Sequence, residues 1–206
     1  MGMVATAVLA TKVINYFRPR YMFMTGICAG ISKEKANFGD IIVAEHVIDG
    51  ASGKYANKGD EHIFVPDYKV INTKPEFLAT IRRLKENKNL MEGIRNMNRP
   101  KVLNPDHSLK VIVGPVASVP AVVADRQVIE SLKGQERKLL GLEMEAYGMY
   151  YAVEHSMRPR PLIVASLKSA TDFADANKSD EYQQYGAMTS SEFLYYIILN
   201  ELDFGR

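Results

Sequence analysis

The fold class is decided by residues 21–30, Tyr-Met-Phe-Met-Thr-Gly-Ile-Cys-Ala-Gly, where a short apolar run ends in small residues. Such a run is typical of a strand that is buried on both faces of a sheet. Glycine and alanine after the strand leave the main chain uncovered, so its N–H and C=O groups can approach a ligand. The turn lacks the GxGxxG and GxxxxGK[ST] spacings, so it supports neither a dinucleotide site nor a P-loop, and a purely structural turn is the alternative.

Similar apolar runs alternate with helical periodicity along the chain. Apolar residues at helical spacing predict a helix over residues 4–17, one after Pro75 and a closing helix that contains Phe193 and Ile197. Further strands are expected at 41–47, 111–114, 139–142 and 161–167. Strands that alternate with helices predict an α/β fold with a mixed, mostly parallel central sheet flanked by helices.

Three local predictions concern the segments between these elements. Residues 49–60 are rich in Gly, Ser, Asn and Lys without periodicity, which indicates a loop. Residues 87–108 are polar and contain two prolines, which indicates a connection within one domain. Residues 189–192, Thr-Ser-Ser-Glu, resemble a capping box and predict the start of the closing helix.

Composition limits the class of protein. The 206 residues, 47% of them hydrophobic, suit a single domain spanning residues 1–206. The 26 basic and 24 acidic residues give no basic excess, so no nucleic-acid partner is expected. Cys28 is the only cysteine, which excludes an internal disulfide and fits the cytoplasm. No signal peptide or membrane span is expected, and the four histidines show no ligand spacing, so neither a metal nor another cofactor is predicted.

Two carboxylates follow the strand expected at 139–142. Glu143 and Glu145 flank Met144 at a strand end, where a buried charge needs donors. A vicinal sugar diol is one such donor pair, because a carboxylate can accept both hydroxyl protons, and methionine offers a soft apolar surface to the sugar ring. The alternative is that both glutamates cap or cover the following helix.

A third polar strand end lies at residues 166–175 and contains Asp172. Asp172 is either a helix N-cap or an acid held in a cleft. Active sites of open α/β sheets gather at the carboxyl ends of the strands. We therefore expect residues 25–30, 142–146 and 168–175 to form one pocket.

Four motifs occur in one order along the chain: Thr-Gly-x-x-Ala-Gly at 25–30, Gly-Asp-Ile-Ile-Val-Ala at 39–44, Glu-Met-Glu-Ala at 143–146 and Thr-Asp-x-Ala-Asp at 171–175. Together they resemble the purine nucleoside phosphorylase and nucleosidase superfamily, above all its methylthioadenosine/adenosylhomocysteine nucleosidase branch. The resemblance implies cleavage of the N-glycosidic bond of an adenosine-type purine nucleoside and a homo-oligomer. The family's opening strands have no counterpart in these residues, so the domain is expected to be N-terminally incomplete.

The resemblance also implies roles for individual residues. Asp172 would protonate or hydrogen-bond purine N7, Glu145 would bind the ribose hydroxyls, and Met144 would pack on the sugar. Glu143 would lie beside the reaction centre, and Lys168 would lie near the attacking water. Thr171 would orient the acid, and Ser118 would lie in the base pocket. The backbone that would face the sugar is that of Gly26, Ile27, Cys28 and Ala29.

The nucleophile is the main point left open. Phosphorylases of this superfamily carry an arginine and a hydroxyl residue around the Thr-Gly turn, where this chain has Met24 and Ile27. Without that arginine a phosphate would lose a bidentate, charge-assisted clamp, which favours water. The alternatives are a phosphorylase whose phosphate contacts come from elsewhere and a nucleoside-binding module without turnover.

Overall fold

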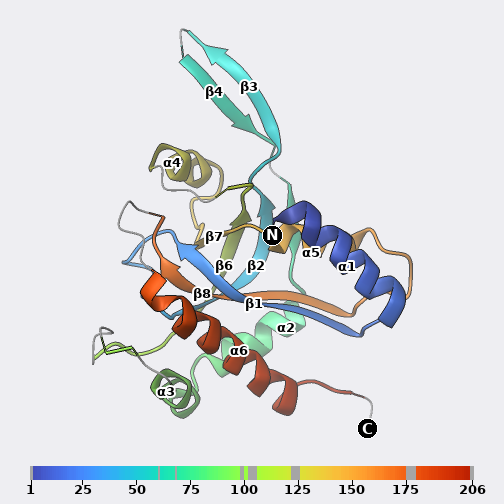
Figure 1. Ribbon diagram of the computed structural model, residues 1–206, viewed down its shortest axis with the longest axis vertical. Coiled ribbons are helices and arrows are strands. Elements are labelled where there is room, and N and C mark those ends of the chain that lie inside the picture. The colour runs from blue at the N-terminus through green and yellow to red at the C-terminus, as the bar shows by residue number, and fades with distance from the viewer. Residues whose placement is uncertain are drawn as a thin grey trace.

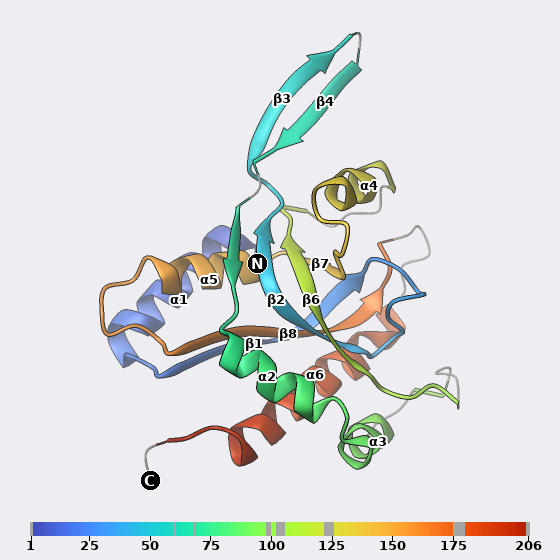
Figure 2. The same ribbon diagram turned by 180° about the vertical axis from the view of Figure 1, so that it is seen from behind.

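The structure is a computed structural model that describes residues 2–59, 61–67, 69–97, 100–101, 106–121, 126–174 and 180–204. Helices surround a six-stranded sheet, and a two-stranded hairpin projects from one end (Figures 1 and 2). The strands are β1 (Tyr21–Gly30), β2 (Ile41–Asp49), β3 (Gly53–Lys58), β4 (Glu61–Pro66), β5 (Val70–Asn72), β6 (Val111–Ser118), β7 (Gly141–Glu143) and β8 (Ile163–Asp172). The helices are α1 (Met3–Phe17), α2 (Pro75–Leu84), α3 (Lys88–Asn96), α4 (Arg126–Gln135), α5 (Ala146–Glu154) and α6 (Gln183–Asn200), with a 3₁₀ turn at Asp180–Tyr182.

The main sheet has the order β5-β2-β6-β7-β1-β8, and β2 also pairs with β8. The strands β2, β6, β7, β1 and β8 therefore close into a ring. The two longest pairings, β1 with β8 and β2 with β6, are parallel, whereas β1 with β7, β2 with β5 and β2 with β8 are antiparallel. The predicted mixed, mostly parallel sheet flanked by helices is confirmed.

Two apolar layers hold the helices against the sheet. Ala10 and Ile14 of α1 pack with α5 and one set of strand side chains. Phe77 of α2, Met91 of α3 and Phe193 of α6 pack with the other set. Of the helices in the described ranges, none is both long and apolar enough to cross a bilayer.

The ends of three strands meet at one place. Ala29 of β1 lies opposite Leu142 of β7 on one side and opposite Asp172 of β8 on the other. Cys28 lies opposite Ala170, so Thr171 is an extra residue in β8 and forms a bulge. Bulges of this kind often occur beside active sites, where they re-aim a side chain.

The prediction of a loop over residues 49–60 was wrong. Residues 53–58 form β3, which pairs with β4 from Gly53 opposite Pro66 to Lys58 opposite Glu61. Tyr55 is 84% exposed, because this hairpin stands away from the body of the molecule. A strand that packs against no core needs no alternation of apolar and polar residues. Residues 53–58 therefore lack the sequence pattern by which half-buried strands are recognised.

The prediction of a capping box at residues 189–192 was also wrong, because α6 begins six residues earlier, at Gln183. The hydroxyls of this segment bond to neighbouring strands and turns instead. Thr189 Oγ1 donates to the carbonyl of Gly39, and Ser190 Oγ contacts both the N–H and the C=O of Gly26 at 3.1 and 3.0 Å. Ser190 thus attaches α6 to β1, and Thr189 attaches it to the turn that precedes β2.

The polar connection predicted over residues 87–108 contains α3. Asn87 caps this helix by accepting a hydrogen bond from the N–H of Leu90 at 3.1 Å. Met91 and Ile94 turn its apolar side to the core. With only two buried positions in nine residues, the apolar pattern was too short to distinguish a helix from a polar loop.

Candidate active site

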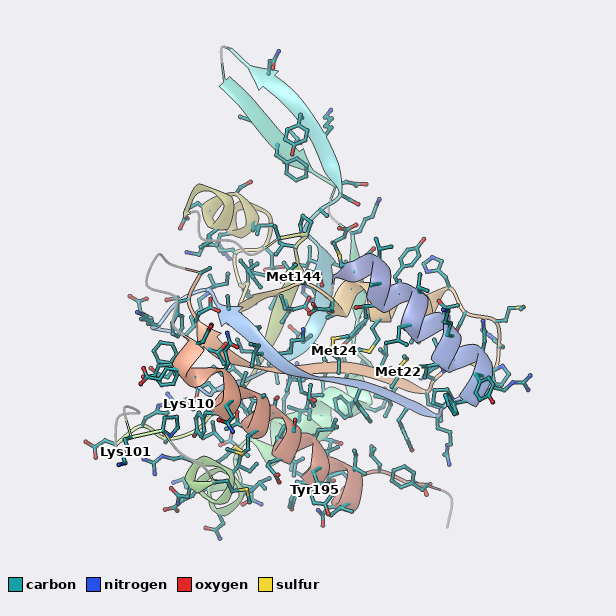
Figure 3. The ribbon with its side chains drawn as sticks, viewed as in Figure 1. Met22, Met24, Lys101, Lys110, Met144 and Tyr195 are labelled. Carbon is teal, nitrogen blue, oxygen red and sulfur yellow. The ribbon has the colours of Figure 1, made fainter. Side chains whose placement is uncertain are left out.

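A cavity of about 190 Å³ opens where β1, β7 and β8 end. Figure 3 labels Met144 beside it, between the end of β7 and the start of α5. The lining residues are Ile27, Cys28, Ala29, Val119, Ala121, Leu142, Glu143, Met144, Glu145 and Asp172. The structure therefore brings together residues from all three of the strand ends that the sequence analysis selected.

Asp172 is the last residue of β8 and is partly buried. Its Oδ1 accepts a hydrogen bond from the N–H of Ala174 at 3.0 Å, which closes a turn directly after the strand. This turn holds the carboxyl group at the edge of the cavity that Met144 and Glu145 also line. An acid at this point can reach a ligand that the two other side chains hold.

Glu145 lies at the start of α5 and contacts the buried cation Lys168. Lys168 Nζ donates to Glu145 Oε2 at 2.7 Å, and the N–H of Gly2 lies 3.4 Å from Oε1. Burial by itself would raise the pKa of Glu145, but the hydrogen bond and charge of Lys168 outweigh burial and lower this pKa. Glu145 is therefore a carboxylate at neutral pH and can accept hydrogen bonds from hydroxyls.

The lowered pKa predicts how the Glu145–Lys168 contact responds to acid. A carboxyl with a depressed folded-state pKa contributes stability above its ordinary value of 4.5 and loses that contribution as the pH falls through the lowered value. Carbon-detected NMR titration of Glu145 should therefore show a midpoint below 4.5. In Lys168→Met the midpoint should rise, because burial is then opposed by the N–H of Gly2 without the hydrogen bond and charge of Lys168, and an unchanged midpoint would show that Lys168 does not set this pKa.

Glu143 is more deeply buried, with 1% of its side chain exposed. Its Oε2 accepts from the N–H groups of Glu145 and Ala146 at 2.9 and 2.8 Å and from Lys168 Nζ at 2.7 Å. Its Oε1 accepts from the hydroxyl of Ser118. Glu143 thus caps α5, which was the structural alternative for the glutamates of this motif.

Lys168 joins the two glutamates. Its side chain is 7% exposed, and Nζ lies 2.7 Å from both Glu143 Oε2 and Glu145 Oε2. Burial by itself would lower the pKa of Lys168, but the two carboxylates outweigh burial and raise it. Because the cation has two charged partners, its burial is compensated.

Four of the residues selected from the sequence do not line the cavity: Lys168, Ser118, Gly26 and Thr171. The Ser118 hydroxyl donates to Glu143 Oε1 and accepts from the N–H of Tyr147 at 2.8 Å. The backbone of Gly26 is held by α6, and Thr171 faces the same helix, since a Cβ on Gly186 would lie 2.3 Å from the Thr171 methyl carbon. The fourth motif ends at Asp175, which lies outside the described residues.

Leu142, in the expected segment 142–146, also lines the cavity, and the structure adds Val119 and Ala121. Val119 directly follows Ser118, in the stretch for which the family resemblance implies a base pocket, whereas the apolar side chain of Ala121 gave no chemical signal in the sequence. Cys28 lines the cavity without nucleophilic chemistry, because burial raises the pKa of its thiol to about 12 and keeps the thiol protonated. In the part of the chain that the structure describes, no three His, Cys, Asp or Glu side chains are grouped closely enough to hold a metal ion.

Comparison with known proteins found a family model and several relatives that are similar to this chain. The model of the phosphorylase superfamily matches residues 1–199. An uncharacterised protein of Sinorhizobium fredii is 31% identical over 198 residues, which cover 96% of this chain and 47% of that protein. The ATP nucleosidase Cap17 of Escherichia coli is 24% identical over 197 residues, which cover 92% of this chain and 38% of Cap17.

The fold itself has solved counterparts. The 5'-methylthioadenosine/S-adenosylhomocysteine nucleosidase of Helicobacter pylori superposes with a TM-score of 0.75 at 18% identity, over 98% of this chain and 77% of that one. The chain spans less than half the length of the two curated relatives described above.

Proposed function

The chain belongs to the phosphorylase superfamily, and from this premise we propose that it cleaves the N-glycosidic bond of an adenosine-type purine nucleoside with water as the attacking group. One observation carries the proposal: a single cavity is lined by the carboxyl of Asp172, by Met144 and Glu145, and by residues 27–29 at the end of β1. The nucleosidases found by the comparisons support the same class of reaction.

In the proposed mechanism the sugar binds between β1 and the start of α5. Glu145 accepts hydrogen bonds from the ribose hydroxyls, and Met144 packs on the furanose ring. Asp172 donates its carboxyl proton to purine N7 as the bond between C1′ and N9 breaks, so adenine leaves as a neutral base. General-acid help of this kind contributes about 10²–10⁴-fold to the rate. Water adds to C1′ and releases one proton to the solvent, which gives free ribose, and the Asp172 carboxylate takes up a proton from the solvent to restore the acid.

The charges around the cavity favour water over phosphate. No residue that lines the cavity among the described residues is basic. The nearby cation Lys168 is already bonded to Glu143 and Glu145. A phosphate ion here would meet the carboxyl groups of Glu143, Glu145 and Asp172 and no charge-assisted clamp, which would weaken its binding.

The candidate substrates differ in the group at the 5′ position of the sugar. The Escherichia coli relative is named for ATP, whereas the solved neighbour is named for methylthioadenosine and adenosylhomocysteine. All three compounds share adenine, ribose and the N-glycosidic bond, and these are the parts that Asp172, Met144 and Glu145 would contact. We therefore keep the adenosine moiety as the proposed substrate class.

A product assay tests the reaction. Purified protein is incubated with adenosine, methylthioadenosine, adenosylhomocysteine or ATP in phosphate buffer, and the base and the sugar are separated by chromatography. We expect adenine together with ribose or its 5′-substituted form. A sugar 1-phosphate would show that phosphate is the nucleophile, and binding without any release of adenine would show a nucleoside-binding module.

A further inference from the structure

The carboxylate of Glu143 is held by groups of the protein. Its Oε2 accepts from the N–H groups of Glu145 and Ala146 and from Lys168 Nζ, and its Oε1 accepts from the Ser118 hydroxyl. Glu143 is among the residues that line the cavity, but only 1% of its side chain is exposed. A nucleoside in the cavity would therefore have little access to this carboxylate.

These bonds connect four elements around Glu145. Ser118 ends β6, Glu143 ends β7, Lys168 lies in β8, and Glu145 comes directly before α5. Glu143 holds the backbone N–H of Glu145 at 2.9 Å, and through Lys168 it also reaches the Glu145 carboxylate, since Nζ bonds both glutamates. Glu143 thereby holds the backbone N–H of Glu145 directly and its carboxylate through Lys168.

We propose that Glu143 is a positioning residue: together with Ser118 and Lys168 it orients Glu145 toward the ribose hydroxyls, and it does not itself contact the nucleoside. This inference rests on the proposed function, because it assigns the ribose-binding role to Glu145. It replaces the role beside the reaction centre that family resemblance implies for Glu143. The consequence is selectivity for ribonucleosides over 2′-deoxyribonucleosides, because an oriented carboxylate gains from the 2′-hydroxyl and a misoriented one does not.

Calorimetry with adenosine and 2′-deoxyadenosine tests the inference without depending on turnover. The wild-type protein should bind adenosine more tightly. In Glu143→Gln the affinity for adenosine should fall about tenfold, the size of one hydrogen bond to a charged group, while the affinity for 2′-deoxyadenosine should fall by a smaller factor, because this ligand offers Glu145 only its 3′-hydroxyl. Glu92→Gln, at an exposed position of α3, is the matched control and should leave both affinities unchanged.

Ser118→Ala gives a second variant that keeps every charge. It removes the hydroxyl on Glu143 Oε1 and should shift the ratio of the two affinities in the same direction by a smaller factor. Because Ser118 acts through Glu143, the double variant should lose no more selectivity than Glu143→Gln alone. If Glu143→Gln does not fold, Ser118→Ala alone still tests whether Glu143 orients Glu145.

Each outcome supports or overturns the inference. An equal loss for both nucleosides, or an unchanged ratio in both variants, would overturn it, and so would a wild-type protein that does not discriminate between the two ligands. A wild-type protein that discriminates but releases no adenine would sink the proposed reaction only, and the variant ratios would still decide the role of Glu143.

Discussion

Asp172→Asn should lower the rate of base release by about 100-fold or more while leaving nucleoside affinity largely unchanged. The amide keeps the size of the side chain and an oxygen that can accept from the N–H of Ala174, so the turn after β8 should persist. It has no carboxyl proton to give to purine N7. Single-turnover release of adenine, followed by chromatography, measures the loss of rate, and calorimetry measures the affinity.

The control for this substitution is Asp203→Asn. Asp203 lies at the opposite end of the sheet, where its carbonyl accepts from the hydroxyl of Tyr21, the first residue of β1. The control should turn over normally. Normal turnover in Asp172→Asn would remove Asp172 as the acid, and an equal loss of affinity and rate would make it a binding residue.

Lys168→Met should have the largest effect on stability. The substitution leaves Glu143 and Glu145 without their shared cation, and one of these carboxylates is 1% exposed. Removing one partner of a buried ion pair typically destabilises a protein by about 3–5 kcal/mol. Urea denaturation at neutral pH should therefore show a much lower unfolding midpoint than that of the wild type.

Two further variants separate charge from packing at Lys168. Lys168→Arg keeps the cation and should lose less stability than Lys168→Met. Lys133→Met removes a lysine whose pair with Glu130 is partly exposed, with 34% of the Lys133 side chain accessible, so it should cost less than about 1 kcal/mol. A loss in Lys168→Met no greater than that in Lys133→Met would show that the buried charges contribute nothing net to stability.

The sequence predicted the elements whose periodicity reflects burial. Tyr21–Gly30 and the helix after Pro75 were recognisable because their apolar residues pack against the core, although residues 21–27 are partly buried and not fully buried as predicted. The projecting hairpin at residues 53–66 was not, since it has no buried face to leave a pattern. Thr189 and Ser190 were misread as a cap, because hydroxyl residues bond turns and strand ends equally well, and only the tertiary structure shows which they meet.

The candidate site, like the fold, could be predicted from the sequence only in part. Which strand ends would meet could be expected from the rule that active sites gather at carboxyl ends, and residues from all three line the cavity. The different surroundings of Glu143 and Glu145 could not be read from the sequence, because the two glutamates lie only two residues apart at the end of one short strand. The difference depends on where Ser118 and Lys168 stand, and that is set by the register of β6 and β8 against β7 and β1.

The bulge at Thr171 decides to which face of the sheet the side chain of Asp172 points. Side chains along a strand point alternately to its two faces, and Thr171 already faces Gly186 of α6. A chain one residue shorter at this point would turn the aspartate toward α6, into a layer filled by Thr189 and Gly186, while Lys168 stayed in place. Such a protein would keep its fold and its ion pairs, but the carboxyl group of Asp172 would no longer line the cavity.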